Sequence, residues 1–388
     1  MPHSRRKRDP WSRRDFLKTG ACGFCALCLG GLHGEGSAQT SAGSAAASKG
    51  FVNPVPSPWF RELSGNGVKC RLCPRECELS PGERAVCRVR ENRGGRGYTL
   101  AYGNPALVRE DPVERLPFFH ILPGSRTLSL STAGCNLSCS FCEVWDMAQV
   151  DPEDLYAYDM PPERVIRHAK ESGLSVLSYA FGEPAVFYEY MHEIASKAKG
   201  EGMANLLHTA AYLRPEPLRD LAPRLDGANV DLKGFDPQFY RDAVGGEMQP
   251  VLDSLKVLRE QGVHLEMTTI LIPGLNDGDE DIEAMCDWIR RELGPDVPLH
   301  FSRFYPLYQL SHLPQTPVST LDRARDTARR VGLEFVYVAR VTGHEGENTF
   351  CPGCGEPIIE RTGFIIDRVR MEEGKCGRCG TRIPGRWN

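Results

Sequence analysis

The chain has 388 residues, of which 25% are charged and 41% hydrophobic, and its formal net charge is −4. These values are ordinary for a soluble globular protein, and the global charge gives no indication of a nucleic-acid partner. The length allows one large catalytic domain together with small modules. The composition departs from the ordinary in its 15 cysteines, which are too many for a typical enzyme.

All but one of the cysteines fall into four tight groups, and their short spacings favour metal ligation over a disulfide framework. The exception is Cys286, which lies in a helical pattern of apolar residues and is expected to pack in the core. In chain order the groups are Cys22/Cys25/Cys28, Cys70/Cys73/Cys77/Cys87, Cys135/Cys139/Cys142 and Cys351/Cys354/Cys376/Cys379.

Residues 1–38 predict a twin-arginine export signal, which is an address read by a receptor. Seven basic residues lie between positions 5 and 18, and Arg13 and Arg14 form the arginine pair. The weakly apolar stretch 19–32 is too short to span a bilayer, so no stable membrane span is expected. Small residues near position 38 offer a cleavage site, and Cys22, Cys25 and Cys28 would be lost with the signal. The signal predicts a periplasmic protein, whereas a vestigial tail would leave the protein in the cytoplasm.

A Ser/Ala/Gly-rich linker is expected at 39–60 and a small cysteine-rich module at 61–120. In the module Cys70, Cys73, Cys77 and Cys87 are separated by two, three and nine residues, with turn-forming residues between them. Four thiolates make a closed site, which favours a structural or electron-relay role. The spacing leaves zinc and a second iron–sulfur cluster both open.

Strand-like and helix-like patterns alternate through a predicted catalytic core at 121–342. This alternation predicts an α/β fold, a partial TIM-type barrel of six βα repeats with its chemistry at the C-terminal ends of the strands. The strand candidates are 127–131, 174–179, 204–208, 228–232, 264–271, 299–301 and 335–338. The helix candidates are 162–172, 188–200, 215–222, 248–261, 279–293 and 320–331.

The loop after the first core strand carries Cys135, Cys139 and Cys142, with three and two residues between them. Thiolates are the usual ligands of iron–sulfur clusters, and three ligands leave one iron of a four-iron cluster open to a small molecule. A structural zinc site is the alternative, but such sites close with four ligands, and no fourth Cys or His lies near this loop.

Polar residues also mark the ends of later strands. Asp231 and Lys233 alternate with apolar residues and would point together into the mouth of the barrel, as a functional pair or as a buried ion pair. The other candidates at strand ends are Gly182, Glu183, Thr209, Pro273 and His300.

Residues 343–388 predict a zinc-ribbon-like module. Cys351 and Cys354 form one Cys-x2-Cys knuckle, Cys376 and Cys379 form another, and a β-prone run lies between them. Closed sites of this form usually hold zinc, so zinc is favoured over iron.

The loop at 135–142 resembles the cluster loop of radical S-adenosylmethionine (SAM) enzymes. From Cys70 to its end, about four-fifths of its length, the chain is similar to the radical SAM member of the AmmeMemoRadiSam system, a family related to the activating enzymes of glycyl-radical enzymes. Further matching stretches are Cys-x-Leu-Cys-Pro-x2-Cys at 70–77, Asp-Pro-Val-Glu at 111–114, Asp-Leu-Lys-Gly-Phe at 231–235, Ile-Pro-Gly-Leu-Asn-Asp at 272–277 and Pro-Leu-His-Phe-Ser-Arg-Phe at 298–304.

The resemblance implies a [4Fe-4S] cluster on Cys135, Cys139 and Cys142 and SAM as the second cofactor. One electron, supplied by a reductant such as flavodoxin or ferredoxin, would cleave SAM to a 5′-deoxyadenosyl radical that abstracts hydrogen. It implies that Asp231 and Lys233 act in catalysis. It also implies that SAM is contacted by Gly182, Glu183, Thr209, Asp231, Pro273 and His300.

The resemblance implies a protein partner of the Memo or AMMECR type as substrate. A glycyl-radical activase of the pyruvate-formate-lyase type is one alternative, and an exported electron-transfer or metal-binding protein without SAM chemistry is another. Three features depart from the family pattern: the export signal, Ala210-Ala211 in place of an Asn-Gly pair, and Glu143-Val144 where Gln-Asn is common.

Overall fold

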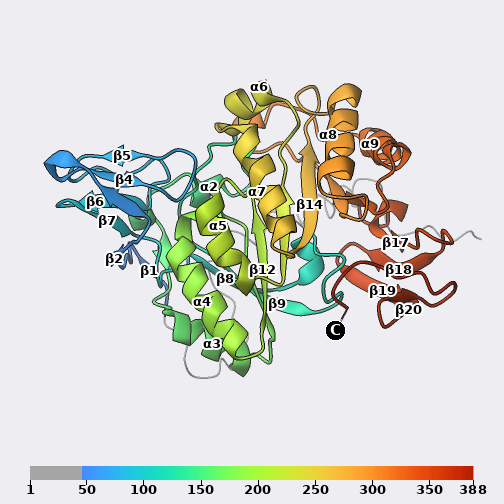
Figure 1. Ribbon diagram of the computed structural model, residues 1–388, viewed down its shortest axis with the longest axis horizontal. Helices are drawn as coiled ribbons and strands as arrows, with labels where there is room; N and C mark the ends of the chain where they lie inside the picture. Colours follow the sequence, from blue (N-terminus) through green and yellow to red (C-terminus); the bar gives the residue numbers. More distant parts are fainter. Residues whose placement is uncertain (1–45, 388) are drawn as a thin grey trace, which may run out of the picture. The chain divides into compact units, whose positions relative to one another are not determined.

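An eight-stranded sheet organises the part of the chain that the computed structural model describes, residues 46–387 (Figure 1). Seven of its strands are parallel, and β8 pairs antiparallel with β9 at one edge. In spatial order the strands are β16 (Val336–Ala339), β15 (Leu299–Arg303), β14 (His264–Leu271), β13 (Gly227–Asp231), β12 (Ala204–Thr209), β11 (Val176–Tyr179), β9 (Arg126–Ser131) and β8 (Leu107–Pro112).

Helices follow the parallel strands and bury an apolar face against the sheet. Prolines at the first turns of α3 and α5 suit helix starts, and α9 ends at Gly332, whose φ of 107° a residue with a Cβ would rarely adopt. The main helices are α3 (Pro162–Glu171), α4 (Tyr188–Gly200), α5 (Pro215–Leu221), α7 (Met248–Glu260), α8 (Asp279–Glu292) and α9 (Val318–Val331). The predicted alternation and the partial barrel are therefore confirmed.

Two short helices and one π-helix stand near the C-terminal ends of the strands: α2 (Trp145–Ala148), α6 (Pro237–Phe239) and the π-helix η6 (Tyr240–Val244). The 3-10 turns are η1 (Ser64–Asn66), η2 (Val113–Arg115), η3 (Pro152–Asp154), η4 (Pro184–Phe187), η5 (Ala222–Arg224), η7 (Tyr308–Leu310) and η8 (Glu345–Glu347).

The segment between β8 and β9 closes the N-terminal end of the barrel. Its apolar side chains form one cluster with residues of β11 and β12 and with Ala180, which directly follows β11, and most of them are completely buried. The cluster contains Val113, Leu116, Phe118, Ile121, Val176, Ala180, Ala204 and Leu206. Sequence periodicity identified neither β8 nor this plug.

The N-terminal module is built from short antiparallel strands. One sheet contains β3 (Phe60–Glu62), β4 (Val68–Cys70) and β5 (Glu78–Leu79); another contains β2 (Val55–Pro56), β7 (Arg96–Thr99) and β6 (Arg90–Arg93). β1 (Ser48–Lys49) pairs with β10 (Tyr156–Ala157) of the core. Residues 46–60 of the predicted linker thus contain two strands. The predicted signal at 1–38, its three cysteines and residues 39–45 lie outside the described residues.

The C-terminal module is a pair of small sheets, β17 (Thr349–Phe350), β18 (Pro357–Thr362) and β19 (Ile365–Val369), and β20 (Met371–Glu372) with β21 (Lys375–Cys376). It is tied to the barrel plug, because Arg361 donates a 2.9 Å hydrogen bond to the carbonyl of Phe119. The described residues belong to a single compact unit.

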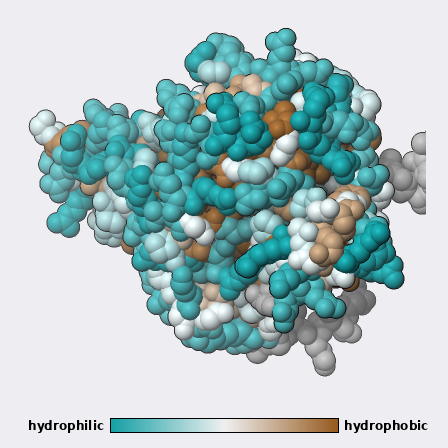
Figure 2. Space-filling view, turned by 45° about the vertical axis from the view of Figure 1, so that its right-hand side comes forward, coloured by the Kyte–Doolittle hydropathy of each residue, from teal (hydrophilic) through white to brown (hydrophobic). Residues whose placement is uncertain are grey.

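None of the helices within residues 46–387 is long and apolar enough to cross a membrane. On the face drawn in Figure 2 hydrophilic residues predominate, and hydrophobic ones come to the surface in patches near its middle.

Candidate active site

The loop that carries Cys135, Cys139 and Cys142 is fixed from one side by η6. The backbone N–H of Ser138 donates to Val244 O (3.1 Å) and that of Ser140 to Ala243 O (2.8 Å). Gly245 follows with a φ of 72°, and a Cβ placed there would lie 2.0 Å from Ser138 Oγ. A glycine is required at this close approach, which holds the loop in one position.

Of the three cysteines of this loop, Cys139 is buried and Cys135 and Cys142 are partly buried. Burial raises the pKa of Cys139 to about 12, although the charge of Lys233 acts to lower it. Burial also raises the pKa values of Cys135 and Cys142. Iron is bound by thiolates, so binding of a metal centre by these three cysteines must release a proton from each thiol.

The three sulfurs are not gathered as closely as those of the C-terminal cysteines. Within residues 46–387, only the C-terminal cysteines bring three or more ligand atoms within 4.8 Å of one another. A four-iron cluster separates its thiolate ligands further than a single ion does. The looser spacing and the set of three thiolates favour a cluster over a structural zinc ion, which usually closes with four ligands.

Glu183 stands beside the loop, at the turn after β11. Its carboxylate accepts hydrogen bonds from the backbone of Ala185 (3.0 Å) and Ala210 (2.9 Å) and from the Thr209 hydroxyl. After burial, the charge of Glu183 is the largest cause of the raised pKa of Cys135, so the two groups are neighbours. The preceding Gly182 packs on Ser131, where an added Cβ would lie 2.6 Å from the hydroxyl oxygen.

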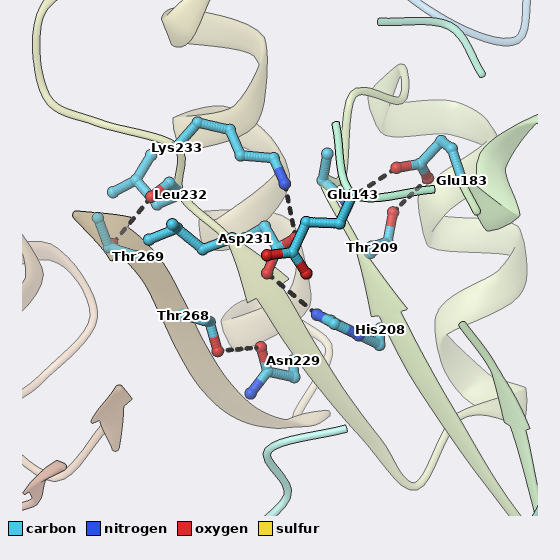
Figure 3. Close-up of polar contacts among 12 residues, drawn as sticks. Glu143, Glu183, His208, Thr209, Asn229, Asp231, Leu232, Lys233, Thr268 and Thr269 are labelled. Carbon is cyan, nitrogen blue, oxygen red and sulfur yellow. Dashed lines mark hydrogen bonds and ion pairs between the residues drawn. The ribbon is translucent and has the colours of Figure 1, made fainter. Parts of the chain in front are cut away.

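Asp231 ends β13 and lies between two cationic or potentially cationic partners (Figure 3). Its Oδ2 is 2.6 Å from Lys233 Nζ, and its Oδ1 is 3.0 Å from His208 Nε2. Burial raises its pKa, but Lys233 and His208 outweigh burial and hold the pKa of Asp231 well below its usual range. Burial lowers the pKa of Lys233, but Asp231 and Cys139 outweigh burial and raise it. The predicted pair therefore lies beside the cysteine loop.

Pro273 lies half-buried in the loop after β14, close to the same strand end. Asn276 fixes this loop by donating to the carbonyls of Lys233 (2.7 Å) and Ile270 (2.8 Å), and its Oδ1 accepts from the backbone of Ile272 (2.6 Å). The loop is thus tied directly to the Asp231–Lys233 segment.

His300 does not join this group. It is fully buried, its Nε2 lies 2.8 Å from Glu266 Oε2, and its ring is 4.8 Å from those of Phe119 and Tyr337. Phe119 belongs to the plug, so His300 packs toward the closed end of the barrel. All the contacts named here are within the protein, and the contact of His300 with SAM stays a prediction.

Glu266 is the centre of a polar network that sequence reasoning missed. Its carboxylate accepts from the backbone N–H groups of Phe119 (3.0 Å) and His120 (2.9 Å), and it also faces His264 and His300. The hydrogen bonds from the two histidines hold its pKa well below the usual range, against the effect of burial. The sequence did offer one indication of this network, because Glu266 is an acidic residue inside an otherwise apolar strand pattern.

Glu143, directly after Cys142, forms an ion pair with Arg340, which follows β16. The Arg340 guanidinium also lies 4.6 Å from the centre of the Tyr305 ring. The pair connects the cysteine loop to the last strand of the partial barrel. The departure from Gln at this position therefore has a structural partner.

The C-terminal cysteines form a compact site of a different kind. Cys351 Sγ lies 3.6 Å from Cys379 Sγ, and Cys354 Sγ lies 3.7 Å from Cys376 Sγ. Four thiolates around one tetrahedral metal ion with bonds of about 2.3 Å lie about 3.8 Å apart. The site therefore fits a single metal ion.

Comparison with known proteins agrees with this arrangement. Residues 129–289 match the family model of the Radical SAM superfamily. An uncharacterized protein of Methanocaldococcus jannaschii is 38% identical over 327 residues, which are 84% of this chain and 97% of that protein. The chain belongs to the radical SAM superfamily.

Other radical SAM relatives match shorter parts of the chain. Benzylsuccinate synthase activating enzyme of Thauera aromatica is 26% identical over 43% of this chain and 55% of its own length. Pyruvate formate-lyase-activating enzyme of Clostridium pasteurianum is 26% identical over 43% of this chain and 71% of its own. A radical SAM methyltransferase structure from Sphaerobacter thermophilus aligns with a TM-score of 0.44 and 17% identity, over 76% of this chain and 80% of that one.

Membership makes the chain an enzyme that uses a [4Fe-4S] cluster and SAM. Its relatives with named activities include activating enzymes and a probable cyclase.

Proposed function

We propose that the chain cleaves SAM reductively and uses the resulting radical to abstract hydrogen from a partner protein of the AmmeMemoRadiSam system. The observation that carries the proposal is the position of Glu183, Asp231 and Lys233 against the cysteine loop. Bound cluster and SAM together supply a 5′-deoxyadenosyl radical; the protein's own task is to bind, orient and exclude water.

Each side chain has a part that follows from its contacts. Cys135, Cys139 and Cys142 hold the cluster. Gly182 and Glu183 shape the strand end next to Cys135, where the backbone and carboxylate would receive the amino group of SAM. Because Thr209 donates to Glu183, it orients that carboxylate.

Asp231 and Lys233 form the opposite side of this mouth. Asp231 stays ionised at neutral pH because Lys233 and His208 stabilise its charge. Lys233 lies near Cys139 and would compensate the negative charge of a thiolate-bound cluster. The loop at Pro273 borders the same space and would cover the adenosyl part of SAM.

The rim of the barrel supports a protein substrate over a small molecule. Trp145, Leu275 and Leu307 are each more than 40% exposed, and each follows the cysteine loop or a strand end. Trp145 is held in place by stacking on Tyr308, with ring centres 5.3 Å apart. Exposed aromatic and aliphatic side chains are typical of protein interfaces.

The test is the dependence of the reaction on a partner. Purified enzyme, reconstituted with iron and sulfide without oxygen, is mixed with SAM, a reductant and a Memo-type or AMMECR-type protein. We expect 5′-deoxyadenosine formation to rise when the partner is added, and the partner to change in mass. Trp145→Ser should weaken the stimulation and leave the partner-free reaction unchanged. Equal rates with and without any of these partners would contradict the proposal.

A second candidate is the activation of a glycyl-radical enzyme, which the two relatives named above favour. This function predicts a glycyl-radical EPR signal on a partner that contains the target glycine. A partner that changes in mass without such a signal would favour the first candidate.

We further propose that zinc occupies the C-terminal site and that the twin-arginine signal exports the loaded enzyme to the periplasm. Zinc is expected from metal analysis of the purified protein, and Cys351→Ser with Cys354→Ser should remove it. Arg13→Lys with Arg14→Lys should retain the protein in the cytoplasm; an unchanged distribution would show a vestigial signal.

A further inference from the structure

The four cysteines of the N-terminal module come together against the catalytic loop. Within this group the backbone N–H of Cys70 donates to the carbonyl of Cys77 (2.9 Å). Burial raises the pKa of Cys73 to about 11, and the neighbouring thiols of Cys70 and Cys77 contribute to the rise. Cys87 in turn is affected by Cys73 and Cys70. The four thiols therefore lie together in one site, in which Cys70 and Cys87 are buried and Cys73 and Cys77 are partly buried.

The sulfurs of this site are not arranged like those of the C-terminal module. Within the described part of the chain the N-terminal group, like the loop at 135–142, does not bring three ligand atoms within 4.8 Å of one another. A zinc ion would require spacings of about 3.8 Å. In this respect the N-terminal group is like the loop to which superfamily membership gives a four-iron cluster, and unlike the C-terminal module.

The buried guanidinium of Arg90 lies next to these thiols, and one of its N–H donors has no hydrogen-bond partner among the described residues. Arg90 is 1% exposed, forms a two-pronged ion pair with Glu189, and its charge acts on Cys70 and Cys87. Its Nε is buried and has no hydrogen-bond partner among the described residues. A cluster with several thiolates and sulfides would supply both the negative charge and an acceptor for this N–H.

The module also touches the catalytic loop on both sides of Cys135. The side chain of Asn136, the next residue, reaches the Cys73 thiol. Gly134, the preceding residue, lies so close to the carbonyl of Cys87 that a Cβ there would be 2.4 Å from that oxygen. Arg75, from the same module, donates to Asn136 O at 2.5 Å.

We infer that Cys70, Cys73, Cys77 and Cys87 hold a second iron–sulfur cluster that passes electrons to the cluster on Cys135, Cys139 and Cys142. The inference goes beyond the proposed function, because it concerns how the enzyme is reduced and does not depend on the substrate.

The proposed relay transfers one electron from the protein donor to the SAM-binding cluster. A reduced flavodoxin or ferredoxin loses one electron to the N-terminal cluster, which returns to its oxidised state when the electron moves on to the SAM-binding cluster. No bond forms or breaks, and no proton moves. The module carries nine basic and five acidic residues between positions 61 and 100, so its charge favours an acidic protein donor in a chain that is acidic as a whole.

The first test isolates the proposed cluster. A variant with Cys135→Ala, Cys139→Ala and Cys142→Ala is reconstituted without oxygen and analysed for iron, sulfide and zinc. We expect about four irons per chain and a four-iron Mössbauer spectrum, with an EPR signal that does not respond to SAM. Adding Cys70→Ser and Cys87→Ser should remove this iron. Zinc in place of iron at this site would overturn the inference, whatever the substrate is.

The second test measures the relay. In Cys70→Ser with Cys87→Ser, 5′-deoxyadenosine formation driven by reduced flavodoxin should fall at least about tenfold, while the dithionite-driven rate stays within about twofold. Cys286→Ala, which removes a buried thiol outside every group, is the control. Equal flavodoxin-driven rates would overturn the relay. If this variant does not fold, the iron content of the triple-alanine variant still decides whether the cluster exists. The relay is then decided by pre-steady-state reduction of the wild-type enzyme. Reduction of the N-terminal cluster before the SAM-binding cluster supports the relay, and any other order contradicts it.

Discussion

The two ends of the barrel hold similar side chains in opposite circumstances. At the mouth, Asp231 is paired with Lys233 and His208, which are 14% and 21% exposed, next to three cysteines. At the closed end, Glu266 is paired with His300, both fully buried beneath the plug and the C-terminal module. Both carboxylates have lowered pKa values, so a perturbed pKa alone does not identify the catalytic end.

What distinguishes the two ends is the access to solvent and the neighbouring groups. Glu266 is completely buried and receives hydrogen bonds from two backbone N–H groups and from His300, with His264 at 3.4 Å, all from within the protein. The groups at the mouth lie beside the thiols of Cys135 and Cys139, which are proposed cluster ligands. The comparison predicts that changes at the mouth reduce activity, whereas changes at the closed end reduce stability.

The largest effect is expected from Cys139→Ala, because it removes one of only three thiolates that hold the cluster. We expect SAM cleavage to be abolished, with the iron at this loop lost and the fold retained. Detection of 5′-deoxyadenosine by chromatography checks the activity, and circular dichroism checks the fold. The matched control Cys286→Ala should remain active, and a cleaving Cys139→Ala enzyme would contradict the assignment of the loop.

The next effect is expected from Asp231→Asn, which leaves Lys233 and His208 without their shared anion. We expect the rate of SAM cleavage to fall about a hundredfold, as for the loss of one preorganised charge in an active site. Because the ion pairs that lower the pKa of Asp231 also stabilise the fold at neutral pH, the melting temperature should fall as well, and activity is therefore compared per folded molecule. A large loss of stability with unchanged activity per folded molecule would make Asp231 a structural residue.

Glu266→Gln should give the reverse result. The amide offers one acceptor oxygen where three hydrogen-bond donors converge, and its NH2 group would face other donors. Breaking a buried charged network of this kind costs roughly 3 kcal/mol of unfolding free energy. Urea denaturation measures this loss. Activity per folded molecule should stay within about twofold of wild type, and a greater loss would place Glu266 in catalysis.

The smallest effect concerns pH. Burial lowers the pKa of His120 to about 3, against about 6.5 in an unfolded chain. Between these values the unfolded state binds the proton, so stability is lost as the pH falls below 6.5. This group alone should cost about 2 kcal/mol between pH 7 and pH 5. Urea titrations at several pH values test this, and His120→Gln should flatten the slope; an unchanged slope would contradict a neutral His120.

The sequence predicted the barrel well because its elements are regular. The strand at 264–271 and the helix at 188–200 were placed to the residue, since periodicity and turn residues set their limits. The cysteine loop and the Asp231–Lys233 pair were found for a related reason, because their spacing along the chain is itself the signal.

The rest depends on contacts between distant segments. His300 sits one residue into an ordinary strand, and only the fold shows that it faces Glu266 and the plug. The support of the cysteine loop by η6 joins residues about a hundred positions apart. No local pattern could have revealed these contacts.

The most direct test of the account is EPR spectroscopy of the reconstituted and reduced enzyme with and without SAM. The account predicts that SAM alters the signal of one cluster, that the altered signal is absent in Cys139→Ala, and that the response persists in Glu266→Gln. A signal that does not respond to SAM in the wild-type enzyme, with iron present at residues 135–142, would contradict the claim that the mouth of the barrel is the catalytic end.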